Sequence, residues 1–150
     1  MTEAFLALGA NLGDRASQLR RSLMQLEERG VRVWQLSRFH RTVPVGGPVD
    51  QPEYLNAVAR VESPVAPHRL LQHCLEVEFE LGRERRTRNG PRSCDLDLLW
   101  FGGCKMVSKA LTLPHPRFAQ RHFVLEPWVE VASRLVVEGR SVSAHLAALD

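Results

Sequence analysis

The order of apolar and polar positions predicts a strand, a turn and a helix within the first thirty residues. Residues 4–8 form a short apolar run, and the segment 9–13, which contains two glycines, ends it as a turn. Within residues 15–29, leucines recur at i, i+4 and i+7, the spacing of one face of an amphipathic helix. Asp14 can cap the first turn of this helix, and Gly30 can end it.

The same alternation continues through the middle of the chain. The patterns predict strands over residues 31–42, 54–62 and 94–101 and a helix over residues 68–81. This helix would bury a broad apolar face made of Leu70, Leu71, Cys74, Leu75, Val77, Phe79 and Leu81. Residues 42–52 contain three prolines and two glycines, which indicates a loop of a length that often carries function.

The last third of the chain continues with short elements. Residues 111–113 and 135–137 are expected to be extended, and residues 123–131 and 143–149 are expected to be helical. The order strand, helix, strand, strand, helix, strand in the first two thirds is the split β-α-β pattern of a ferredoxin-like α+β sandwich. We therefore predict a mainly antiparallel sheet covered by helices, in a single domain over residues 1–150.

Length and composition narrow the class of protein. At 150 residues, with 44% hydrophobic and 25% charged residues, the chain can bury one core, and disordered and fibrous classes are excluded. No apolar run approaches the roughly 20 residues that span a bilayer, and the first residues lack the pattern of a signal peptide. Three widely spaced cysteines fit reduced thiols better than disulfides or a zinc site. No long heptad pattern predicts assembly, so we expect a soluble cytoplasmic monomer without a membrane partner.

Positive charge is concentrated in one short segment. The chain has a formal net charge of +3, and residues 83–92 carry five arginines against one glutamate. Fixed guanidinium groups are frequent partners of phosphates, so this segment could hold a polyphosphate. A solvated surface loop and a nucleic-acid patch are the alternatives. Against nucleic acid, the segment contains no aromatic residue on which a base could stack.

Two carboxylates interrupt the apolar strand that follows this segment. Asp95 and Asp97 are separated by Leu96, so in a strand both carboxylates point to one face, with Cα atoms roughly 6.6 Å apart, while Leu96 points to the core. Two such carboxylates repel each other unless arginines or cations lie close by. Mg²⁺ suits them because it takes a few carboxylates together with phosphate oxygens and water. The alternative is a pair of salt bridges to the neighbouring loop.

One histidine has an unusual setting. His115 lies between Pro114 and Pro116, which leave little backbone freedom, and such a fixed imidazole is suited to a phosphate contact. The other five histidines fit neither a metal-ligand spacing nor a nucleophile pattern. The sequence contains no Gly-x-Ser-x-Gly elbow, and the segment 9–13 matches neither a Walker loop nor a dinucleotide-binding loop.

Several sequence blocks stand out when they are taken together. They are Leu-Gly-Ala-Asn-Leu-Gly-Asp (8–14), Gln-Pro-Glu-Tyr-Leu-Asn (51–56), Leu-Gly-Arg (81–83), Gly-Pro-Arg-Ser-Cys-Asp-Leu-Asp-Leu (90–98), and Leu-Pro-His-Pro-Arg (113–117) with Arg-His-Phe-Val-Leu (121–125). In this order, from about residue 5 to residue 132, they resemble the 6-hydroxymethyl-7,8-dihydropterin pyrophosphokinase family. Their joint occurrence is specific, although each block alone is not.

The resemblance implies a fold and a reaction. The fold would be ferredoxin-like, and the hydroxyl of the pterin would attack the β-phosphorus of the co-substrate ATP and expel AMP. Asp95 and Asp97 would hold two Mg²⁺ that bridge the phosphates. The partners would then be two small-molecule substrates, ATP and a reduced pterin, and not a nucleic acid.

The resemblance also implies roles for individual residues. The catalytic group would be Arg83, Arg92, Asp95 and Asp97. The ATP-binding group would be Glu78, Arg85, Arg92, Leu98, His115 and Arg121. The pterin-binding group would be Thr42, Val43, Pro44, Val45, Tyr54, Asn56 and Phe123. An Asn amide can read the donor and acceptor edge of a pterin, and aromatic rings can sandwich its flat face.

Three positions differ from well-known members of that family. Asn89 stands where these members have a Trp that closes over the pterin, Val43 where some have Pro, and Ala110 where some have Arg. Asn89 motivates a second hypothesis, a pterin- or nucleotide-binding paralogue without turnover. The fold and the arginine segment motivate a third, an RNA-binding module. In the favoured hypothesis, residues 42–52 and 82–92 act as lids.

Overall fold

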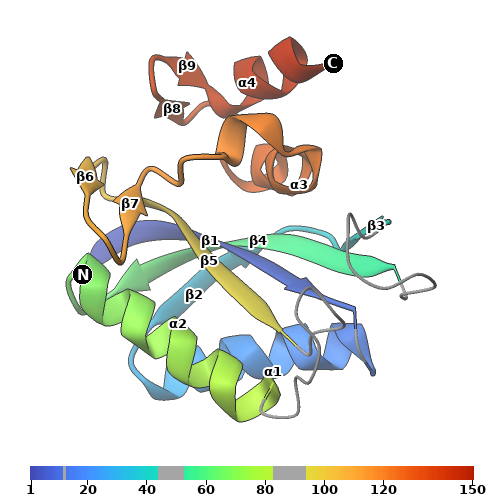
Figure 1. Cartoon of the computed structure of the whole chain (residues 1–150), viewed down its shortest axis with the longest axis vertical. Helices are drawn as coiled ribbons and strands as arrows, with labels where there is room; N and C mark the ends of the chain where they lie inside the picture. Colours follow the sequence, from blue (N-terminus) through green and yellow to red (C-terminus); the bar gives the residue numbers. More distant parts are fainter. Residues whose placement is uncertain (12, 44–52, 83–93) are drawn as a thin grey trace.

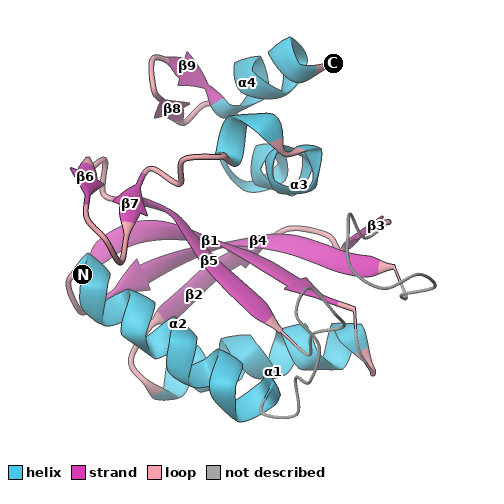
Figure 2. Ribbon diagram, viewed as in Figure 1, coloured by secondary structure: helices cyan, strands magenta, loops and turns pink. Residues whose placement is uncertain are grey.

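An antiparallel sheet of five strands organises the chain (Figures 1 and 2). The computed structural model describes residues 1–11, 13–43, 53–82 and 94–150. The strands are β1 (Thr2–Ala10), β2 (Arg32–Leu36), β3 (His40–Thr42), β4 (Tyr54–Ser63) and β5 (Asp95–Phe101). They run in the order β2, β4, β1, β5, and the short β3 pairs with the first residues of β4. This order and the antiparallel ladders confirm the predicted ferredoxin-like arrangement.

Two helices, α1 (Arg15–Glu28) and α2 (Pro67–Gly82), lie together on one face of the sheet (Figure 1). Asp14 caps α1, because its Oδ1 accepts a hydrogen bond from the amide of Ser17 at 3.2 Å. The predicted leucine face of α1 is buried against the sheet. Gly30 follows the helix with φ of 89°, a left-handed conformation that suits glycine. The sequence pattern therefore located both ends of α1.

The buried face of α2 is narrower than predicted. Leu70, Cys74 and Val77 are buried, but Leu75 and Phe79 are 54% and 68% exposed. The reason is that residues 70, 74 and 77 share one stripe of a helix with 3.6 residues per turn, whereas 75 and 79 lie roughly 130–170° round the helix from that stripe. The prediction that all seven apolar residues form one buried face was wrong for these two.

A second layer covers part of the opposite face (Figure 1). It contains the hairpin β8 (Val136–Val137) with β9 (Arg140–Ser141), the short η1 (Phe118–Gln120), α3 (His122–Ala132) and α4 (Val142–Leu149). The hairpin β6 (Met106–Val107) with β7 (Thr112–Leu113) lies beside β5, and its Met106 and Leu113 pack against the first core. Trp128 is the centre of the second layer, with the rings of Phe5 and Phe118 at 5.8 and 5.7 Å from it. The predicted helices and short extended pieces of this region are confirmed. In the described ranges, no helix is long and apolar enough to cross a membrane.

The strand predicted over residues 31–42 is divided into β2 and β3. Leu36 pairs with Ala59 and His40 with Asn56, so this side of the ladder contains one extra residue. Ser37 marks the break: its amide donates to the carbonyl of Val58, and its hydroxyl accepts from the amide of Val58, both at 2.9 Å. The hydroxyl therefore replaces a backbone partner, and the strand resumes in a new register.

A second irregularity lies in β5. Trp100 pairs with Phe5 and Leu98 with Leu6, which leaves Leu99 as an extra residue. The side chain of Leu99 is buried in the second core, and its carbonyl accepts a hydrogen bond from the amide of His115 at 2.9 Å. The bulge thus holds the backbone of His115 against the sheet.

Candidate functional site

Asp95 and Asn56, two of the predicted site residues, lie at one end of the sheet, on the face opposite α1 and α2. Asp95 pairs with Gly9 and Gly9 with Asn56, so these residues form a row across β5, β1 and β4. His40 of β3 continues the row because it pairs with Asn56. Paired residues lie roughly 5 Å apart in antiparallel ladders, so about 10 Å separates the Cα atoms of Asp95 and Asn56. The predicted metal ligand and the predicted pterin ligand share one face.

The two aspartates of β5 have the arrangement that the sequence predicted. Leu96 is buried in the core beneath α1 and α2, whereas Asp95 is half-buried and Asp97 is exposed on the other face. Among the described residues, no group of three or more His, Cys, Asp or Glu side chains forms a metal-binding cluster. The donor set is therefore a pair of carboxylates, which fits Mg²⁺ because this ion takes its other ligands from water and phosphate oxygens.

Glu78 of α2 lies at the outer edge of β5. Its Oε2 accepts a hydrogen bond from the amide of Leu96 at 2.6 Å. Because β5 is the last strand of the sheet, this amide faces away from β1 and needs a partner from outside the ladder. The carboxylate of Glu78 supplies that partner beside the two aspartates, a contact that the sequence did not predict.

Two cysteines border the aspartates without offering reactive thiolates. Burial is the main cause that raises the pKa of Cys74 to about 12, and the charge of Glu78 adds to it. Burial likewise raises the pKa of Cys94, the residue before Asp95, to about 12. Both thiols are therefore protonated at neutral pH and pack as small apolar groups.

His115 is held in one tautomer by its own turn. Its Nδ1 accepts a hydrogen bond from the amide of Arg117 at 3.1 Å, so the proton of the neutral ring is on Nε2. Burial, assisted by the charges of Arg121 and Arg117, lowers the pKa of His115 below its ordinary 6.5, although Asp97 acts in the opposite direction. At neutral pH the side chain is therefore a neutral imidazole with one N–H donor.

The start of α3 brings together two residues that were assigned to different substrates. Arg121 precedes the helix, and its guanidinium carbon lies 5.5 Å from the centre of the Phe123 ring, within reach of a cation-π contact. Phe123 is 39% exposed. The residue predicted to grip ATP therefore touches the residue predicted to stack on the pterin.

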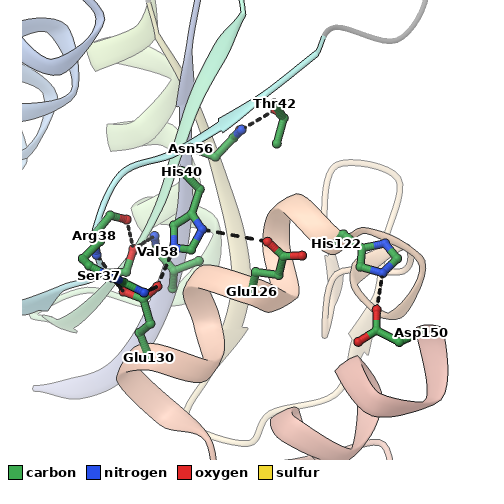
Figure 3. Close-up of polar contacts among 10 residues, drawn as sticks. All are labelled: Ser37, Arg38, His40, Thr42, Asn56, Val58, His122, Glu126, Glu130 and Asp150. Atoms are coloured by element: carbon green, nitrogen blue, oxygen red, sulfur yellow. Dashed lines mark hydrogen bonds and ion pairs between the residues drawn. The ribbon is translucent and has the colours of Figure 1, made fainter.

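Asn56 is fixed by a neighbour from β3. Its Nδ2 donates a hydrogen bond to Oγ1 of Thr42 at 2.7 Å (Figure 3). On its other side lies Gly9, where a Cβ would lie 3.2 Å from Oδ1 of Asn56 and 3.8 Å from the ring of Tyr54. Gly9 thus keeps open the space beside both residues. The sequence reasoning missed this role, although a glycine at the end of a strand can indicate a close approach.

The remaining predicted residues divide into two groups. The side chain of Leu98 is buried in the core, so only its backbone can reach a ligand, and Val43 is exposed. Outside the described residues lie Arg83, Arg85, Arg92, Pro44, Val45 and Asn89, together with most of both predicted lids.

A known protein family matches most of this chain. The family model described as 7,8-dihydro-6-hydroxymethylpterin-pyrophosphokinase matches residues 5–133. The chain belongs to this family. The match includes every described residue of the candidate site, whereas β8, β9 and α4 lie beyond it. The sequence resemblance is thereby confirmed.

Two bacterial members of the pyrophosphokinase family are similar to this chain over most of their length, and a longer plant protein is similar to it over a part. The chain is 42% identical over 151 residues to the 2-amino-4-hydroxy-6-hydroxymethyldihydropteridine pyrophosphokinase of Methylorubrum extorquens, covering 100% of this chain and 95% of that protein. It is 38% identical over 139 residues to the protein of the same name from Bacillus subtilis, covering 92% and 83%. In the Folate synthesis bifunctional protein of Arabidopsis thaliana, 36% identity extends over 144 residues, only 30% of that longer protein.

The pyrophosphokinase fold is also shared with solved structures. The Plasmodium falciparum HPPK-DHPS wild type with SDX-DHP aligns with 99% of this chain and 43% of its own, with a TM-score of 0.73 and 14% identity. At that identity the likeness concerns the fold alone.

Proposed function

We propose that the chain transfers pyrophosphate from ATP to the hydroxymethyl group of 6-hydroxymethyl-7,8-dihydropterin and releases AMP, a step of folate synthesis. Membership of the pyrophosphokinase family and the names of its relatives support this reaction. The observation that carries it is the row of Asp95, Gly9 and Asn56 on one face of the sheet. The row puts the carboxylate of Asp95 at one end and the fixed amide of Asn56 at the other, and Gly9 between them has no side chain.

The transfer is a single displacement at phosphorus. The hydroxyl oxygen of the pterin bonds to the β-phosphorus, while the bond from that phosphorus to the bridging oxygen of the α-phosphate breaks. AMP leaves, and the hydroxyl proton passes to solvent. Asp95 and Asp97 would hold two Mg²⁺, which would neutralise the phosphate charge.

On the nucleotide side, we assign to His115 and Arg121 the side-chain contacts with ATP, beside the other members of the ATP-binding group. The Nε2–H of His115 donates to the nucleotide as a neutral donor, and Arg121 supplies a positive charge beside it. Leu98 contributes through its backbone, and Glu78 fixes the edge of β5 nearby. Arg83, Arg85 and Arg92 close over the phosphates, a role that rests on the family resemblance.

On the pterin side, Asn56 reads the polar edge of the ring with Thr42 fixing its amide. Tyr54 and Phe123 contact the flat faces. Val43, Pro44 and Val45 complete the slot by resemblance. Gly9 lies beneath the ring and leaves space for it. We further infer that the protein acts as a cytoplasmic monomer on these two small molecules.

Release of AMP from ATP and Mg²⁺, measured with and without the pterin, tests the proposal. The wild type should release AMP only when the pterin is present. Asp97→Ala should lose at least about a hundredfold in kcat, because an exposed carboxylate that holds a metal contributes several kcal/mol in the transition state. Circular dichroism should show that the variant is folded, since Asp97 is outside both cores.

Two results would contradict the proposal. Near-normal turnover by folded Asp97→Ala would exclude the metal role of this residue. A wild type that binds the pterin but releases no AMP would favour the binding paralogue that Asn89 suggested.

A further inference from the structure

A polar cluster joins the beginning of β3 to α3, outside the residues assigned to either substrate. Oε1 of Glu130, in α3, accepts a hydrogen bond from the backbone amide of Arg38 at 2.8 Å. The guanidinium of Arg38 also donates to this carboxylate, from Nε to Oε1 and from a terminal nitrogen to Oε2, both at 3.4 Å. Oε2 of Glu130 lies 2.5 Å from Nε2 of His40 (Figure 3). The other ring nitrogen of His40 faces Glu126 of the same helix, at 3.9 Å. One carboxylate therefore holds two residues of the chain that leads into β3.

Within this cluster, His40 and Glu130 are shielded from solvent, whereas Arg38 is not. The side chains of His40 and Glu130 are only 20% and 22% exposed. Burial raises the pKa of Glu130, but hydrogen bonds from Arg38 and His40 outweigh this effect, and the pKa of the carboxyl lies below its ordinary 4.5. Glu130 is therefore charged at neutral pH. The guanidinium of Arg38 is 84% exposed, so its share of the interaction is screened by solvent.

The position of His40 links this cluster to the pterin slot. His40 lies directly opposite Asn56 in the ladder of β3 and β4, and two residues later Thr42 accepts the hydrogen bond of the Asn56 amide. β3 has three residues and pairs with β4 alone among the described strands. Such a short strand needs contacts other than its ladder to keep its place. Ser37 holds it to β4 on one side of the break, and Glu130 holds it to α3.

The other wall of the slot belongs to the same helix. Phe123, Glu126 and Glu130 are spaced at i, i+3 and i+7, so they share one face of α3. One end of this face presents the aromatic ring assigned to the pterin, and the other end holds β3. The distance between the Asn56 amide and the Phe123 ring is therefore set through α3.

We propose that Glu130 and His40 are positioning residues for the pterin: the hydrogen bond between their side chains fixes β3 relative to α3, and so sets the width of the slot between Asn56 with Thr42 and Phe123. This inference rests on the proposed function, because it requires that Asn56 and Phe123 contact the pterin. Neither Glu130 nor His40 needs to touch a substrate. Their effect should be larger on pterin recognition than on ATP binding, since His115 and the aspartates are held by β5 and by the turn after β7. Arg121, at the start of α3, is the ATP-assigned residue that moves with the helix.

The test compares the pterin and ATP parameters of three variants at the cluster. Glu130→Ala removes every contact of the carboxylate, Glu130→Gln keeps an acceptor for the Arg38 amide without the charge, and His40→Gln removes the imidazole. We expect KM for the pterin to rise roughly tenfold in Glu130→Ala and less in Glu130→Gln, since hydrogen bonds to charged groups are the stronger ones. KM for ATP should stay within about twofold, because α3 carries Arg121 but neither His115 nor the aspartates. A smaller folded fraction alone would lower the apparent kcat and leave both KM values unchanged. Partial rescue by Gln distinguishes positioning from a general defect.

Two control variants make the outcomes separable. Glu3→Gln breaks an ion pair of the same 2.5 Å length, with Arg60, between β1 and β4 at the far end of the sheet, and should leave KM for the pterin unchanged. Asn56→Ala should raise KM for the pterin if the slot is assigned correctly. An unchanged pterin KM in folded Glu130→Gln and His40→Gln, beside a raised one in Asn56→Ala, would overturn the inference alone. No effect of Asn56→Ala would overturn the slot assignment and the inference with it.

Discussion

The two faces of the sheet are made by the same strands, but they differ in how far they are covered. On the face of α1 and α2, the side chains of β1 are buried from one end of the strand to the other, at Ala4, Leu6, Leu8 and Ala10. On the opposite face, the residues of β1 become smaller from Phe5 to Ala7 to Gly9. Phe5 lies under α3, whereas Gly9 lies in the row that joins Asp95 to Asn56.

The difference shows how one strand can serve stability and chemistry together. Because side chains alternate between the two faces, a strand can keep a continuous apolar core on one side while its other side changes from core to site. β5 does the same, with Leu96 and Leu98 on the closed face and Asp95 and Asp97 on the open one. Substitutions on the closed face should therefore change stability, and those on the open face should change activity.

Removal of the divalent cation should have the largest effect on the open face. In excess chelator, AMP release should fall below detection, because the charge on the phosphates is no longer neutralised. Added Mg²⁺ should restore it. The melting temperature should change little in the absence of ATP, since the two carboxylates lie outside both cores. A large fall in melting temperature would mean that the ion is structural.

Leu6→Ala should have the largest effect on the closed face. Leu6 is fully buried between the sheet and the helices, so its truncation should lower the free energy of unfolding by about 2–5 kcal/mol. The activity of the folded fraction should be retained. Met24→Ala is a matched control on α1, because Met24 is 62% exposed and should change the free energy by less than about 0.5 kcal/mol. Denaturant titration measures both, and equal values would contradict a closed core on this face.

Gly9→Ala tests the difference between the two faces within β1, because it adds a side chain at the open end of the strand. The new Cβ would lie 3.2 Å from Oδ1 of Asn56, so the amide must move by a few tenths of an ångström. We expect KM for the pterin to increase about tenfold, equivalent to about 1.4 kcal/mol, with a smaller change in stability. Steady-state kinetics with the pterin varied at saturating ATP would measure this, and an unchanged KM would exclude Gly9 from the pterin slot.

The smallest predicted effect concerns pH. Because the pKa of His115 is lowered in the folded protein, folding favours the neutral ring. The corresponding stability is present above the ordinary value of 6.5 and is lost as the pH falls through 6.5 toward the folded pKa. His115→Gln should reduce this part of the pH dependence of unfolding. A variant with the same pH dependence as the wild type would show that His115 does not contribute.

The sequence predicted the elements whose periodicity is regular. The leucines of α1, the cap at Asp14 and the alternation around Leu96 are local signals, and local physics decides them. The division of the strand at Ser37 was not predictable, because it depends on a hydrogen bond with Val58 of another strand. Leu75 and Phe79 were placed wrongly, because composition shows that a helix is apolar without showing which stripe finds a partner.

The candidate site was predictable to a similar extent. Blocks of sequence pointed to Asp95, Asp97 and His115 because each has an unusual local setting. Contacts between distant segments had no such signal: His40 and Glu130 are 90 positions apart, and each looks like an ordinary surface residue in the sequence. The open space beside Gly9 depends on the register of β1 with β4, which no single segment encodes.

The extra residue at Leu99 reverses which face of the sheet the even- and odd-numbered side chains of β5 occupy. Before it, odd-numbered residues of β5 face the site and even-numbered ones face α1 and α2; after it, Trp100 contacts Phe5 in the second core, and Phe101 belongs to the first. A deletion of this one residue would therefore force a choice between two misfits. Either Trp100 and Phe101 exchange faces, or Asp95 and Asp97 turn into the apolar core. The placement of Asp95 and Asp97 on the open face thus depends on a residue count as well as on residue identity.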